Sequence, residues 1–169
     1  MRPFPRRRYR RLRDLIEDMH SLMARRDETR TLMHGETLDP AFRERLMLAV
    51  TQVNRCRYCS YVHAREALTA GIPQDELAAL AEGEFGGSPS EQRPALFYAE
   101  HFAENDGNPD PKAWSRLVEI YGDETAHAID LALRVIRIGN LMGNTFDYIL
   151  YRLSLGHWGL GRRKTVSDT

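Results

Sequence analysis

The 169-residue sequence has only two cysteines, no excess of either charge and no long apolar run. Lys plus Arg and Asp plus Glu each total 24, so the formal net charge is zero and gives no reason to expect nucleic acid or a membrane as partner. The missing apolar run excludes a helix that spans a bilayer. We therefore expect a cytoplasmic protein, in which a lone Cys pair is more often catalytic or metal-binding than structural.

The first residues depart from this balance, because seven arginines and no acids lie between Arg2 and Arg13. No apolar segment follows, so this stretch does not resemble a secretory or twin-arginine signal. We interpret residues 1–13 as a solvated basic arm and residues 161–169 as a flexible tail. Residues 14–160 suit one domain in length.

Strand signals are almost absent, which leaves an all-α fold. The one hairpin-type dipeptide, Asp106-Gly107, begins a proline-containing loop. Elsewhere apolar residues recur three and four apart, as on one face of a helix. One helix begins clearly, with Asp39 as N-cap and Pro40 in its first turn. Another is expected from near Tyr9, with these residues on its apolar side: Leu12, Leu15, Ile16, Met19, Leu22 and Met23.

Both cysteines belong to one motif, Cys56-x-x-Cys59-x-x-x-His63. Residues three and four apart share a helix face, so the three side chains should form one stripe. A thiolate is favoured by a helix N-terminus, which points to Cys56, and by a neighbouring base, which points to Cys59. We interpret Cys59 as the nucleophile, because a positioned base can also carry its proton, and Cys56 as the resolving thiol.

Three chemistries fit this motif. In thiol redox chemistry, a sulfenic acid formed on one cysteine condenses with the other to a disulfide. A zinc site would have three ligands here, but a helical stripe converges them poorly. Two buried thiols without function are the third interpretation. We favour redox chemistry, with no metal and no organic cofactor, because the only two cysteines are in phase with His63.

A histidine acts better as a base when a carboxylate orients it. The preceding segment offers Glu36, Asp39 and Glu44, of which Asp39 is assigned to helix capping. Glu44 falls near the inward side of its helix and is our candidate. Its alternative role is an exposed ion pair with Arg43 or Arg45.

The segment RERLMLAVTQVNRCRYCSYVHAREALTAGI, within residues 40–72, resembles the core of the AhpD-like, carboxymuconolactone decarboxylase family. That family's pattern is a Glu, an apolar helix and then Cys-x-x-Cys-x-x-x-His, with the first Cys twelve positions after the Glu. Glu44 precedes Cys56 by twelve residues. We take residues 40–71 as the core motif of an AhpD-like helical bundle.

The resemblance implies a function and roles for named residues. In the peroxidase members the Glu, both Cys and the His form a proton relay, which here implies Glu44, Cys56, Cys59 and His63. Some members carry a second His before the second Cys, where this chain has Tyr58 as an auxiliary candidate. The implied protein is an antioxidant, thiol-dependent hydroperoxide reductase. It would depend on an external dithiol, lipoyl or thioredoxin-like reductant and form a homo-oligomer, a trimer or hexamer.

Two other functions stay open. A decarboxylase-like acid/base enzyme would act on a small lactone or keto acid through Glu44 and His63, although such members generally lack the Cys pair. A non-catalytic helical oligomer or binding module would use the arginine arm as its contact. Features that favour close packing or association are the paired glycines Gly139 and Gly143 and the aromatic residues Trp114, Tyr148, Tyr151 and Trp158.

Overall fold

Residues 3–160, which the computed structural model describes, fold into helices joined by short loops and contain no strand. This confirms the all-α, single-domain expectation, while the predicted tail at 161–169 lies outside the described residues. No helix in this part of the chain has the length and apolar character needed to cross a bilayer. The helices are α1 (Leu12–Ala24), α2 (Arg26–Met33), α3 (Pro40–Asn54), α4 (Arg57–Thr69), α5 (Gln74–Ala81), α6 (Arg93–Glu104), α7 (Pro111–Tyr121) and α8 (Asp123–Leu153).

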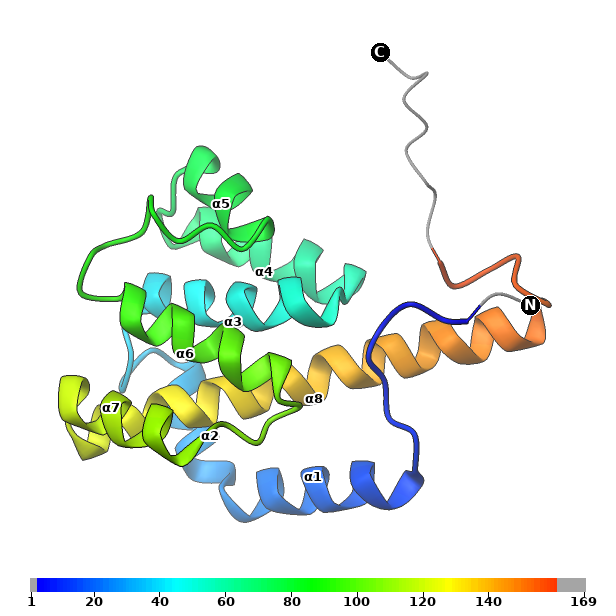
Figure 1. Ribbon diagram of the computed structural model, residues 1–169, viewed down its shortest axis with the longest axis horizontal. Helices are drawn as coiled ribbons and strands as arrows, with labels where there is room; N and C mark the ends of the chain where they lie inside the picture. The colour runs from blue at the N-terminus through cyan, green and yellow to red at the C-terminus, as the bar shows by residue number, and fades with distance from the viewer. Residues whose placement is uncertain (1–2, 161–169) are drawn as a thin grey trace.

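Helix α3 forms the centre of the fold and packs against α4, α5, α6 and α8 (Figure 1). Its predicted start is confirmed, since the Asp39 side chain accepts a hydrogen bond from the Phe42 backbone N–H at 3.0 Å and Pro40 occupies the first turn. Leu46, Ala49 and Val50 are completely buried. Because α3 has neighbours on several sides, it is the element that can present a side chain to the motif from within the core.

The chain turns sharply between α3 and α4. Arg55 adopts a left-handed conformation, with φ at 56°, which L-amino acids other than Gly, Asn and Asp seldom adopt. The last carbonyl of α3, on Asn54, accepts a hydrogen bond from Asn144 of α8 at 2.8 Å. This break places the cysteine motif at the beginning of α4.

Helix α1 differs from its prediction in its start and in its packing. It begins at Leu12, not near Tyr9, and none of its residues is buried. Leu12, Ile16 and Met23 are 71%, 58% and 61% exposed. The apolar periodicity predicted the helix correctly, but a periodic pattern cannot say whether the same chain supplies a surface to cover that face.

Part of the basic arm, around Arg6, Arg7 and Tyr9, packs against the helices, whereas the arm was expected to be solvated; residues 10–13 are exposed. It runs across α8 before the chain enters α1 (Figure 1). Arg7 donates hydrogen bonds to the Ala103 and Glu104 carbonyls at the end of α6, at 2.8 and 2.9 Å. Tyr9 is buried, and its N–H donates to Thr145 of α8. The carbonyls at the end of α6 therefore bind Arg7, which was expected to face water. The boundaries at residues 13 and 14 stay a prediction.

Candidate active site

The two cysteine side chains meet at the N-terminus of α4. Cys56 is the N-cap residue, and its sulfur accepts a hydrogen bond from the Cys59 backbone N–H at 3.3 Å. The two Sγ atoms lie 2.6 Å apart and both thiols are free. A disulfide has its sulfurs about 2.05 Å apart, so bond formation demands little movement. Cys56 is 0% exposed, whereas Cys59 is half-buried.

The two thiols share one proton unequally. The hydrogen bond from the Cys59 thiol lowers the pKa of Cys56 to about 7, assisted by the backbone N–H groups of Cys59 and Tyr58 and opposed by burial. The pKa of Cys59 is raised, because its thiol donates to Cys56 and is itself desolvated. The negative charge therefore resides on Cys56 at rest, chiefly because the Cys59 thiol donates to it, and the backbone N–H groups at the helix N-terminus add to this effect.

This asymmetry predicts how the reduced protein titrates. We expect the thiolate ultraviolet absorbance to rise with a midpoint near pH 7, and Cys56→Ser to remove that transition. Because the folded pKa of Cys56 lies below its ordinary value of 9.0, ionisation stabilises the reduced fold fully above pH 9 and this contribution is lost as the pH falls through about 7. Titration of both thiols near their ordinary value would contradict the assignment of the charge.

A carboxylate orients the histidine of the motif. Glu44 reaches His63 from α3, with Oε2 2.7 Å from Nδ1. The Nε and Nη2 atoms of Arg43 lie 3.1 and 3.0 Å from the other carboxylate oxygen. Glu44 is only 2% exposed and Arg43 is also buried. Glu44 therefore both orients His63 and pairs with Arg43, and the ion pair is buried and not exposed. Arg43 was not predicted to belong to the site.

The arrangement fixes what the imidazole can do. An ionised Glu44 accepts the Nδ1 proton of His63, which leaves Nε2 free to take a proton. Among the described residues, no hydrogen bond joins His63 to either sulfur. A proton moving between Cys59 and His63 must therefore pass through a water, through the substrate or by a side-chain rotation.

A second buried carboxylate, Asp147 of α8, holds the residues between the cysteines. Arg57 donates to its two oxygens at 3.0 and 2.7 Å, and the Tyr58 hydroxyl lies 3.3 Å from Oδ1. Arg6 of the arm donates to Oδ2. Tyr58, the auxiliary candidate, thus directs its hydroxyl to Asp147. Nothing in the sequence marked Asp147, because it lies 90 residues beyond Arg57.

Helix α8 also shapes the space around the sulfurs. A Cβ added at Gly143 would lie 3.0 Å from the Cys56 sulfur, so a side chain there would crowd that sulfur, whereas a Cβ added at Gly139 would meet no atom within 4 Å. Asn140 is fully buried between Asn54 and Thr51, and its hydrogen bond with Cys59 opposes the raised pKa of that thiol. The sequence suggested a purely structural role for this part of α8. The signal that could have pointed to Asn140 and Gly143 is the repeat of Gly139-Asn140 four positions later, at Gly143-Asn144.

Fold and site together define the class: a helical protein with a free Cys pair at a helix N-terminus and a buried Glu–His pair beside it. No group of three metal-ligating side chains is arranged for a metal within residues 3–160. A family model described as "Carboxymuconolactone decarboxylase family" matches residues 17–100, which include Glu44, both cysteines and His63. The chain belongs to this family, as the resemblance indicated. Comparisons with curated proteins and with solved structures each gave no significant match.

Proposed function

We propose that this protein is an AhpD-like, thiol-dependent hydroperoxide reductase. The observation that carries the proposal is the pair of free thiols whose sulfurs lie 2.6 Å apart at the start of α4. A hydroperoxide can approach Cys59, which is half-buried, but not Cys56, which lies behind Cys59 against Gly143. Cys59 is therefore the nucleophile and Cys56 the resolving thiol.

The reaction begins with a proton transfer. Cys59 holds the shared proton at rest, and this proton passes to the Cys56 sulfur or, through a water, to His63. The Cys59 thiolate then attacks the terminal oxygen of the hydroperoxide, the O–O bond breaks, and the alkoxide takes a proton and leaves as an alcohol. Cys59 is left as a sulfenic acid.

Resolution follows at the same helix end. The Cys56 thiolate attacks the sulfenic sulfur, an S–S bond forms, and the hydroxyl group leaves as water after taking up a proton. One hydroperoxide and two thiols thus give an alcohol, a water and a disulfide. An external dithiol, lipoyl or thioredoxin-like reductant restores both thiols. Glu44 steadies the His63 ring throughout, and Arg43 fixes Glu44.

The proposal includes a homo-oligomer, a trimer or hexamer, in the cytoplasm. Its support is an exposed apolar stripe on α8, at one-turn spacing. Of the aromatic residues suggested for association, Trp158 is exposed but Tyr151 is buried against Phe4 and was wrongly suggested. The stripe consists of Met142, Phe146, Ile149 and Leu153.

Counting free thiols tests the proposal directly. The reduced protein is treated with a substoichiometric series of cumene hydroperoxide, the reaction is stopped with an alkylating agent, and the attached groups are counted by mass spectrometry. We expect species with two and with no free thiols, interconverted by a dithiol, because the disulfide consumes both cysteines together. Retention of both thiols at excess peroxide would overturn the proposal.

A decarboxylase-like activity is the second candidate, and the buried Glu44–His63 pair favours it, because that pair is assembled without help from either sulfur. On this alternative the substrate is a small lactone or keto acid and His63 transfers the proton. A non-catalytic binding module, the third candidate, has no turnover of either kind.

A further inference from the structure

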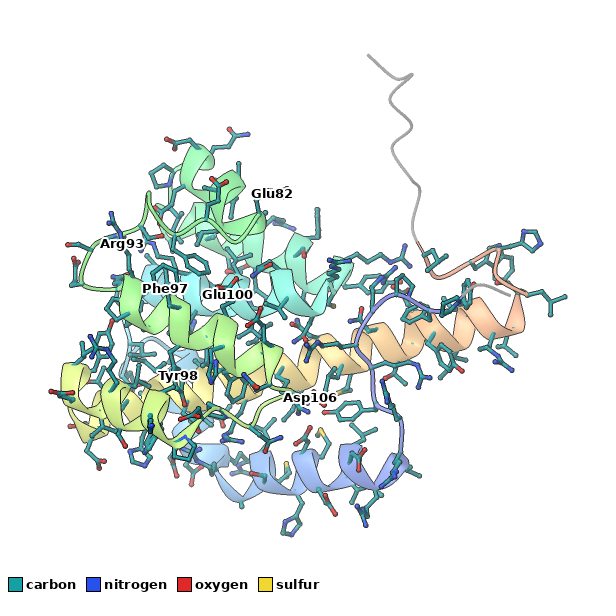
Figure 2. All side chains as sticks on the ribbon, viewed as in Figure 1. Glu82, Arg93, Phe97, Tyr98, Glu100 and Asp106 are labelled. Atoms are coloured by element: carbon teal, nitrogen blue, oxygen red, sulfur yellow. The ribbon has the colours of Figure 1, made fainter. Side chains whose placement is uncertain are left out.

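The arm and α8 together line a cavity of about 860 Å³. Six of its fifteen lining residues are arginines. Asp106, which follows α6 beside the arm, is one of only two acids in the lining (Figure 2). The arginines that line the cavity come from the arm and from α8: Arg6, Arg7, Arg8, Arg10, Arg137 and Arg152.

Three of these six arginines make structural contacts. Arg6 binds Asp147, Arg7 binds the carbonyls at the end of α6, and Arg137 binds Asp18 and Asp106. These contacts hold the arm on α8 and keep the cavity open.

The other three arginines have no carboxylate partner within residues 3–160. Arg8 lies with its guanidinium 3.7 Å from the centre of the Tyr148 ring and donates only to the Tyr9 carbonyl. Arg10 and Arg152 are exposed, and their side chains make no hydrogen bond or ion pair in the described part of the chain. Three guanidinium groups without counter-charge at one cavity are unexpected in a chain whose net charge is zero.

We propose that this cavity binds a small phosphorylated molecule, with its phosphate held by Arg8, Arg10 and Arg152. Guanidinium groups match phosphate oxygens in a planar, bidentate geometry. The volume falls within the range of small-molecule sites. Six arginines and two acids line the cavity, which leaves an excess of positive charge for an anionic ligand. No cysteine lines the cavity, so the proposal is independent of the thiol chemistry.

Calorimetric titration of the full-length protein with inorganic pyrophosphate at physiological salt tests this site. We expect saturable binding of one pyrophosphate per chain, weakened about tenfold by Arg10→Gln and again by Arg152→Gln, since each removes a charge-assisted hydrogen bond. Neither arginine has a structural partner, so both variants should fold. Arg116→Gln, on the exposed side of α7, is the matched control and should leave binding unchanged.

Three results would overturn the assignment. Binding that survives in the double variant would show that the cavity arginines take no part. An equal loss in the Arg116→Gln control would show attraction by bulk charge alone. Sedimentation of the protein with vesicles containing phosphatidic acid, without binding of pyrophosphate, would assign the arginines to a lipid headgroup and not to a free phosphorylated molecule.

Discussion

Replacing Cys59 by serine is expected to reduce hydroperoxide consumption by roughly 10³-fold or more, because it removes the proposed nucleophile, the less buried of the two cysteines. Replacing Cys56 by serine should have a different effect. The first step then still occurs, but the sulfenic acid on Cys59 cannot be resolved, so turnover stops after one equivalent of peroxide. Stopped-flow peroxide consumption and trapping of the sulfenic acid with dimedone measure the two steps separately.

The two serine variants control for each other, because they differ by three positions in one motif. A sulfenic acid that forms in Cys59→Ser and not in Cys56→Ser would reverse the two roles. The same proteins separate the alternatives for the family. If Cys59→Ser leaves turnover of a lactone or keto acid intact while His63→Ala removes it, the acid/base function is correct. If neither activity is measurable in the unmodified protein, the binding module remains.

Replacing Glu44 by glutamine is expected to lower the free energy of unfolding by about 3 kcal/mol, the usual cost of leaving one member of a buried ion pair without its partner. Arg43 and Glu44 are both nearly inaccessible to water, and Arg43 also donates to the Leu32 and Met33 carbonyls. The amide cannot neutralise the guanidinium that remains. Urea denaturation of the reduced proteins should show a lower midpoint with an unchanged slope.

Two further variants identify the cause of that loss. Glu66→Gln, on the exposed face of α4, makes the same chemical change outside the core and should alter stability by less than about 0.5 kcal/mol. Adding Arg43→Met to Glu44→Gln removes the unpaired charge and should recover part of the lost stability. Equal stabilities of Glu44→Gln and the unmodified protein would mean that the buried pair is not formed in solution.

The sequence predicted the parts of the site that depend on short-range spacing. Asp39 and Pro40 marked the start of α3. Helix geometry relates residues a few positions apart, so the side-by-side placement of Cys59 and His63 on α4 follows from their numbers alone. The same reasoning chose Glu44, because its place on the apolar pattern of α3 put it near the inward side.

Only the tertiary structure decided which residues of distant segments complete the site. Asp147, Asn140 and Gly143 reach the motif from α8, and Arg6 arrives from the arm. It also decided that Cys56 is enclosed while Cys59 is not, and that the apolar face of α1 is left uncovered within the chain. Periodicity fixes which side chains share a helix face, through backbone angles that are local. Which faces then pack together depends on how all the helices fit at once, and no spacing along the chain encodes that fit.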